Sequence, residues 1–267
     1  MNRTDSQLAG RLSLVPRGGR RRPAPPALVV VAHGSRDPRA LSTVGTLLDR
    51  VRDLRPDLPV HLGHIELNEP LLSDTLARLD ATDTADAVLV PLLLSRGYHV
   101  RRDIPEMAAQ VRVRTRVAAP LGPHPLLVET LHARLVEAGW HTRMTDAERR
   151  ASAVVLAAAG SRDPDSAVDT GRTARLLADR LGVPVVPAYA STAASTVPAA
   201  VRALAARGRH RVAVASYFTA PGRFATECAQ AAPWIAAAPL GTHEAMAHLV
   251  LHRYDQARAV SVGSNAA

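Results

Sequence analysis

Short apolar runs alternate along the chain with segments whose apolar residues recur every three or four positions. Residues 27–31 are five consecutive apolar residues, which is typical of a strand buried on both faces of a parallel sheet. Helical spacing follows at 41–54 and predicts an amphipathic helix. Further strands are predicted at 60–65, 87–94 and 111–118, and further helices after Pro70, after the loop at 95–107 and at about 125–138. This alternation indicates right-handed βαβ units and a parallel sheet.

The pattern of the first half returns in the second half. Three segments match in the same order: 34–38 matches 160–164, 88–92 matches 212–216, and 118–124 matches 237–243. Ordered matches of this kind indicate a tandem duplication of one α/β unit.

We therefore predict an α/β fold with two tandem Rossmann-like lobes, each a parallel sheet of about four strands flanked by helices. The predicted parts are a flexible basic tail at 1–26, an N-terminal lobe at 27–140 and a degenerate second lobe at 141–267. Open parallel sheets bind ligands beyond the carboxyl ends of their strands, so we expect a cleft between the lobes.

Composition narrows the class of protein. Apolar residues make up 47% of the chain, as in globular proteins, and aromatic residues only 3%, which argues against a stacking surface for single-stranded nucleic acid. No apolar stretch approaches the roughly 18 residues of a membrane span. The single cysteine, Cys228, can form neither a disulfide framework nor a thiolate metal site, and it fits a reducing cytoplasm.

The net charge of +9 is unevenly distributed, and every basic residue except histidine is arginine. Six arginines lie in residues 1–25, beside a single acidic residue, Asp5. This composition cannot bury enough apolar surface to order itself, so we interpret the segment as a tail. A nucleic-acid-binding arm is the alternative interpretation.

Three residues of the first repeat combine ligand chemistry with regular spacing. His33 directly follows the first predicted strand, Glu66 follows the second, and His99 lies in the loop after the third. The carboxyl ends of neighbouring parallel strands meet at one edge, so these side chains can converge there. Two imidazoles and a carboxylate suit Fe²⁺, Co²⁺, Ni²⁺ or Zn²⁺ and leave coordination positions open. His64 is the chief competitor, because it lies on the same strand face as Glu66.

The second repeat provides an internal comparison. His33 aligns with Ala159, Glu66 aligns near Ser191, and His99 aligns with Arg223. All three candidate ligands are missing there, although the apolar strands remain. We therefore expect one metal site per chain, in the first lobe.

The segments AHGSRDPRA, HIELNEP and PLLLSRGYHVRRDIPEM together resemble the sirohydrochlorin chelatases of siroheme and cobalamin biosynthesis. The resemblance covers nearly the whole chain after the tail, in the double-length form. It implies the class II chelatase fold and an ATP-independent lyase that inserts Fe²⁺ or Co²⁺, with Ni²⁺ a further candidate, into a tetrapyrrole. It also implies that His33, Glu66 and His99 bind the metal and assist deprotonation. The sequence contains neither a GxGxxG nor a GxxxxGK[ST] motif, so we predict no nucleotide cofactor.

The implied substrate, sirohydrochlorin, carries eight carboxylates, for which arginine is the best bidentate partner. The candidate arginines flank the predicted metal loops or lie at the equivalent loops of the second lobe: Arg36, Arg96, Arg101, Arg102, Arg162 and Arg223. Gly97 and Gly222 would let these loops approach a macrocycle closely.

Other functions stay open at this point. A non-catalytic metal or tetrapyrrole carrier could use the same lobes, and a metal-dependent hydrolase could use the same ligands. The ligand set does not choose between iron and cobalt. We expect a monomer or weak oligomer, because an internal duplication lessens the need for a second chain.

Overall fold

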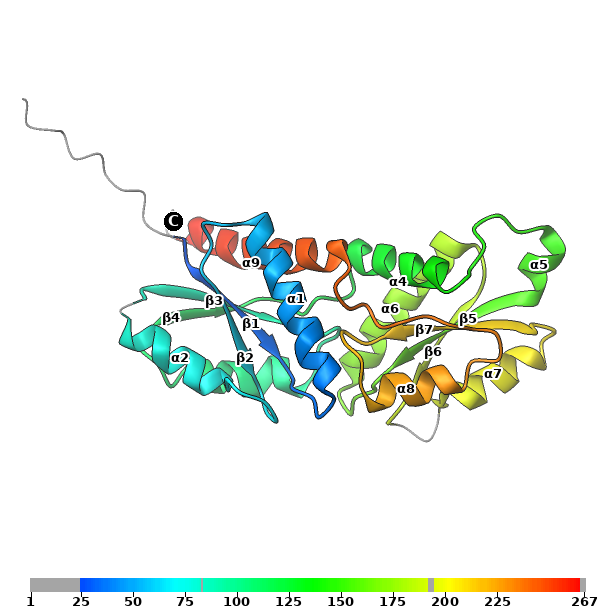
Figure 1. Ribbon diagram of the computed structural model, residues 1–267, viewed down its shortest axis with the longest axis horizontal. Coiled ribbons are helices and arrows are strands. Elements are labelled where there is room, and N and C mark those ends of the chain that lie inside the picture. Colours follow the sequence, from blue (N-terminus) through cyan, green and yellow to red (C-terminus); the bar gives the residue numbers. More distant parts are fainter. Residues whose placement is uncertain (1–24, 83, 192–194, 265–267) are drawn as a thin grey trace, which may run out of the picture.

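Two four-stranded parallel sheets form the framework of the computed structural model, which describes residues 25–82, 84–191 and 195–264. The first sheet has the order β2-β1-β3-β4 and the second the order β6-β5-β7-β8. Their strands are β1 (Ala27–Ala32), β2 (Val60–His64), β3 (Asp86–Pro91), β4 (Arg114–Val117), β5 (Ser152–Ala158), β6 (Val185–Tyr189), β7 (Arg211–Tyr217) and β8 (Ile235–Ala236). The equal orders confirm the predicted pair of α/β lobes (Figure 1).

Helices join and cover the strands. In chain order they are α1 (Pro38–Leu54), α2 (Leu72–Ala81), η1 (His99–Asp103), α3 (Ile104–Ala108), α4 (Pro125–Glu137), α5 (Asp146–Ala151), α6 (Pro164–Leu181), α7 (Val197–Ala205), α8 (Arg223–Gln230) and α9 (Glu244–Ser264). None of the helices in the described ranges is long and apolar enough to cross a membrane.

Two predicted strands are shorter than expected. The strand predicted from 111 begins only at Arg114, because the backbone N–H of Val113 donates to the Asp80 carboxylate rather than to a neighbouring strand. The strand predicted to reach residue 94 ends at Pro91, and the segment beyond it turns toward the second lobe.

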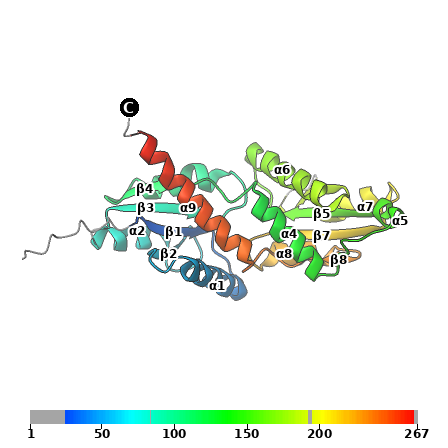
Figure 2. The same cartoon turned by 90° about the horizontal axis from the view of Figure 1, so that it is seen from above.

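The last helix of each repeat covers the sheet of the other repeat. Helix α4 packs against β7 and α6 of the second lobe, whereas α9 returns to pack on β3, β4 and α1 of the first. Figures 1 and 2 show α4 and α9 side by side along one face of the molecule. An ion pair between Arg55 and Asp255, 2.6 Å long, fixes α9 to the end of α1.

The core is continuous between the lobes as a result. One cluster of buried apolar residues includes Leu28 of β1, Leu131 of α4, Leu156 of β5 and Leu249 of α9. The opposite face of each sheet has its own smaller cluster, beneath α2 and α3 in the first lobe and beneath α7 and α8 in the second. The predicted tail at 1–26 lies outside the described residues except for its last two positions.

Candidate metal and substrate site

The three predicted ligands lie together at the carboxyl edge of the first sheet. The Nε2 atom of His33 is 3.3 Å from Oε1 of Glu66. The ring centroids of His33 and His99 are 4.9 Å apart, with the rings tilted by 47°. All three side chains are partly accessible, with exposed fractions of 46% for His33, 55% for Glu66 and 36% for His99.

Backbone hydrogen bonds hold the loops after β1 and β2 together. The N–H of Glu66 donates to the carbonyl of His33 at 3.1 Å, and the N–H of Ser35 donates to Oδ1 of Asn68 at 2.6 Å. Gly34 permits this approach: its φ is +104°, and a Cβ added there would lie 1.9 Å from the Glu66 carbonyl oxygen. The His-Gly-Ser sequence therefore fixes where His33 and Glu66 stand relative to each other.

His99 is oriented by Asp103, a residue that the sequence interpretation did not include. The five residues from His99 to Asp103 form a single turn of π-helix, a feature often found at functional sites. This turn places Nδ1 of His99 2.5 Å from Oδ2 of Asp103. A carboxylate accepts hydrogen bonds, so this contact favours the tautomer of the neutral ring with the proton on Nδ1, in which Nε2 has the lone pair for a metal or a proton. The sequence did contain a signal for this pair, because Asp103 is an acidic residue four positions after His99.

Burial favours the neutral form of His33. Partial burial lowers the pKa of His33 below its ordinary value, the neighbouring His99 lowers it further, and Glu66 opposes both effects. A neutral imidazole is the form that can ligate a metal or accept a proton at neutral pH.

His64, the competing candidate, is a buried residue with an exposed fraction of 1%. Its Nδ1 lies 3.2 Å from the carbonyl oxygen of Pro70, and its Nε2 has no partner among the described residues. Within the described ranges, no three His, Cys, Asp or Glu side chains stand in positions that could hold a metal ion together. The role of His33, Glu66 and His99 as joint ligands therefore stays a prediction, and it requires movement of side chains such as the exposed Glu66.

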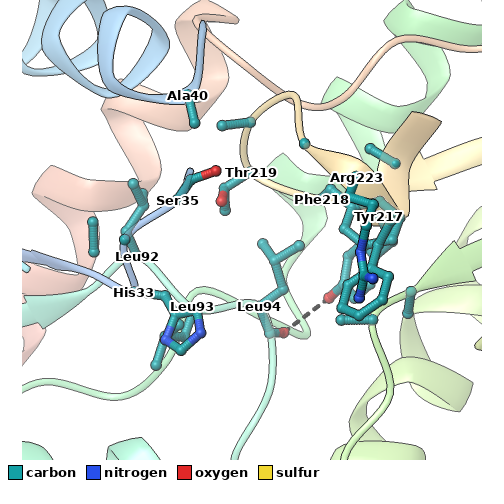
Figure 3. Close-up of a pocket in the computed structure, with 18 of the residues that line it drawn as sticks. His33, Ser35, Ala40, Leu92, Leu93, Leu94, Tyr217, Phe218, Thr219 and Arg223 are labelled. Atoms are coloured by element: carbon teal, nitrogen blue, oxygen red, sulfur yellow. Dashed lines mark hydrogen bonds between the residues drawn. The ribbon is translucent and has the colours of Figure 1, made fainter. Parts of the chain in front are cut away.

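The predicted cleft between the lobes is present beside these residues. It has a volume of about 1360 Å³ and is lined by loops of both repeats. Figure 3 shows His33 on one side, Tyr217, Phe218 and Arg223 on the other, and Leu94 between them. A cleft of this size exceeds the usual pocket for a drug-sized ligand, so it can accept a macrocycle.

The six candidate arginines have different surroundings. Arg36, Arg96 and Arg223 line the cleft, whereas Arg101, Arg102 and Arg162 are not part of its lining. The guanidinium of Arg96 pairs with Asp165 and Asp169 of the second lobe, and that of Arg101 pairs with Asp163 and Asp165. Arg223 is 76% exposed and lies over the Phe224 ring at 4.7 Å.

The second lobe keeps the backbone geometry of the site without its ligands. The N–H of Ser191 donates to the carbonyl of Ala159, as that of Glu66 donates to His33. Arg223, aligned with His99, begins α8 beside the cleft. The second lobe thus repeats this backbone hydrogen bond but has no imidazole or carboxylate at the three aligned positions.

Comparison with known families identifies the fold family. Residues 27–138 and, separately, residues 153–257 match the CbiX family. The chain belongs to the CbiX family. The family's unit is therefore present twice, once in each repeat.

Curated relatives of this CbiX chain differ in the metal that they are named for. The sirohydrochlorin cobaltochelatase of Methanococcus aeolicus is 33% identical over 81 residues, which cover 30% of this chain and 57% of that protein. The sirohydrochlorin ferrochelatase of Bacillus subtilis is 28% identical over 170 residues, which cover 61% of this chain and 62% of that protein. The chain thus matches less than two thirds of the length of either relative.

A solved structure supports the fold assignment. SirB from Bacillus subtilis, solved with Fe³⁺, has a TM-score of 0.72 and 22% sequence identity, covering 89% of this chain and 97% of that one. At this identity the likeness shows the shared fold.

Proposed function

We propose that this CbiX chain is a sirohydrochlorin chelatase, an ATP-independent lyase that inserts a divalent metal ion into a tetrapyrrole at the cleft between its lobes. The observation that carries the proposal is that His33 and His99 line a cleft large enough for a macrocycle, with Glu66 3.3 Å from His33. Named relatives with this activity support it.

Metal insertion must deliver a partly dehydrated divalent ion and remove two protons from the pyrrole nitrogens, so that charge balances. In the proposed mechanism, the lone pairs of His33 and of Nε2 of His99 take up the incoming ion. Glu66 lowers the net charge of the bound ion and receives the two pyrrole protons in turn, passing each one to water before it accepts the next. Asp103 keeps His99 in the tautomer that this requires.

Arginines that are not committed to ion pairs across the lobes are proposed to hold the substrate carboxylates. Arg36 and Arg223 fit best, since both are exposed and line the cleft. Arg102 and Arg162 are exposed but lie outside the lining, so they rank below these two. Either iron or cobalt suits the ligands, and the relatives are named for both.

A reducing cytoplasm is part of the same proposal, because the buried Cys228 is a free thiol.

The test is a metal panel. Purified protein is mixed with sirohydrochlorin and Fe²⁺, Co²⁺, Ni²⁺ or Zn²⁺, and loss of the free macrocycle's absorbance is followed. We expect catalytic turnover with iron or cobalt, and loss of turnover in His33→Ala and His99→Ala. Equal rates in wild type and both variants would reject the site. Uptake of one equivalent without turnover would instead identify a carrier.

A further inference from the structure

Three consecutive residues of the loop that leads from β3 to His99, Leu94, Ser95 and Arg96, are hydrogen-bonded to the second lobe. Arg96 donates three hydrogen bonds to the Asp169 carboxylate: its backbone N–H at 3.0 Å, its Nε at 2.9 Å and its Nη2 at 2.7 Å. The Asp169 side chain is only 2% exposed. Burial alone would raise the pKa of Asp169, but the hydrogen bonds from Arg96 outweigh it and hold that pKa below its usual value. The pair is therefore ionised at neutral pH.

Neighbouring residues of the same loop make parallel contacts. The hydroxyl groups of Ser95 and Ser166 are 2.9 Å apart. The Tyr217 hydroxyl donates to the Leu94 carbonyl at 2.9 Å (Figure 3). Arg101, within the π-turn that begins at His99, pairs with Asp165. Contacts to the second lobe thus lie on both sides of His99 in the chain.

Comparison of the two repeats shows that these contacts have no counterpart between α1 and the loop before Arg223, two segments that the structure describes in full. Positions in α6 correspond to positions in α1 that lie 126 residues earlier. Where α6 has Asp165, Ser166 and Asp169, α1 has the residues Arg39, Ala40 and Thr43. In the reverse direction, the residue that aligns with Arg96 in the loop before Arg223 is Ala220. The lobe without the predicted ligands supplies the acids, and Asp165 and Asp169 pair with arginines on either side of His99 in the chain.

From this we infer that Asp169 is a positioning residue: through Arg96, it holds His99 in place opposite His33. The inference rests on the proposed function, because it assigns the second lobe a part in that same site. A buried carboxylate with a bidentate guanidinium has one favourable geometry, so it fixes the loop more tightly than exposed pairs do. The second repeat then holds His99 in position, although all three predicted ligands come from the first repeat.

The test compares Asp169→Asn with Asp86→Asn. Asparagine keeps the shape of the side chain but removes its charge. Asp86 is the matched control, because it pairs with an exposed arginine, Arg114, at the opposite end of β3. Both measurements are made at a temperature at which every variant is folded. Calorimetry gives the Co²⁺ affinity, and NMR of the metal-free protein gives the imidazole signals of His99. The His99→Gln variant assigns those signals.

We expect Asp169→Asn to shift the His99 signals and to weaken Co²⁺ binding by about tenfold, as loss of an outer partner of a ligand typically does. The Asp86→Asn control should match wild type in both readouts. If Asp169→Asn does not fold, Arg96→Lys provides the same test, because it keeps the charge and loses the planar fork; it should give a smaller change in the same direction.

Unchanged His99 signals and unchanged Co²⁺ affinity in the folded variants would overturn the inference, even if the variants unfold at lower temperature. Failure of the proposed function looks different. In that case wild type would bind Co²⁺ without inserting it, or would not bind Co²⁺ at all. The His99 signals still decide the positioning role in either case.

Discussion

The Nε2 atom of His33 and the Oε1 atom of Glu66 are 3.3 Å apart, although the two residues come from different strand ends. The hydrogen bond from the Glu66 main-chain N–H to the His33 carbonyl holds the two residues close together independently of their side chains. An imidazole and a carboxylate at this distance can share a proton or a metal ion, and the first prediction tests which residue of the pair moves the proton.

Glu66→Gln should lower kcat for metal insertion by roughly 100-fold or more, because an amide cannot accept a pyrrole proton. Co²⁺ should still bind through the two imidazoles, with reduced affinity. Stopped-flow absorbance of the macrocycle measures the rate. Glu69→Gln, an exposed change in the same loop, is the control and should keep the wild-type rate. A Glu66→Gln enzyme as fast as wild type would show that another group takes the proton.

Metal insertion should decline in acid, because protonated imidazole has no lone pair. His33 should contribute to the acid limb of kcat/KM, and burial, then the neighbouring His99, lower the pKa of His33 below its ordinary value. Glu66 raises that pKa, so Glu66→Gln should move the limb further toward acid. A pH–rate series on both proteins measures the shift. An acid limb that Glu66→Gln leaves in place would contradict a role for His33 in setting it.

Arg223→Gln should raise KM for the tetrapyrrole by about tenfold and change kcat little, since a rim arginine binds ground state and transition state alike. Arg223 is exposed and lines the cleft. Arg175→Gln on α6, outside the cleft lining, is the matched control. A fall in kcat at constant KM would place Arg223 at the reacting centre instead.

Gly34→Ala should destabilise the loop between His33 and Glu66 by about 2 kcal/mol, because a non-glycine residue is strained at this φ and the added Cβ meets the Glu66 carbonyl. Urea unfolding measures the stability and calorimetry the Co²⁺ affinity, and both should fall. Gly45→Ala is the control: a Cβ there meets nothing within 4 Å, so stability should stay equal or rise. Wild-type Co²⁺ affinity in Gly34→Ala would show that the site tolerates movement of this loop.

Acid should weaken the start of α4 through His124. Its Nδ1 accepts a hydrogen bond from the Leu126 N–H at 3.2 Å, which a protonated ring cannot do. Burial, then Arg253 and His252, lower the pKa of His124 to about 4. Since the folded pKa lies below the unfolded one, this contribution to stability is complete above about 6.5 and is lost as the pH falls toward about 4.

His124→Asn should therefore reduce the loss of unfolding free energy on acidification, because asparagine caps helices without titrating. Urea unfolding of wild type and variant across this pH range measures the difference. His141→Asn, an exposed change, is the control. A constant difference between His124→Asn and wild type at every pH would contradict the titration.

The fold could be predicted from the sequence to a large extent. Apolar runs such as 27–31 locate the central strands, because strands buried on both faces have few polar positions, and the internal repeat predicts equal sheets. Strand ends were less predictable. Val113 continues the apolar pattern, yet its N–H bonds to a side chain outside the sheet.

The exchange of α4 and α9 could not be predicted, because a repeat fixes the order of elements and not the sheet that each helix covers. The closeness of His33 to Glu66 and to His99 could be predicted from strand topology, whereas their joint role as metal ligands stays a prediction. Asp103 was detectable from its spacing to His99. The pairing of Arg96 with Asp169 required the relative placement of the lobes, since the residues are 73 positions apart and neither has an unusual local pattern.

The crossed packing of α4 and α9 also limits how this molecule can come apart. Cleavage of the connector between α4 and α5 would leave two fragments, each still holding a helix that completes the other's core. Such fragments are expected to remain associated and to unfold together. We therefore expect the two lobes to unfold as one cooperative unit, because neither has a complete core on its own.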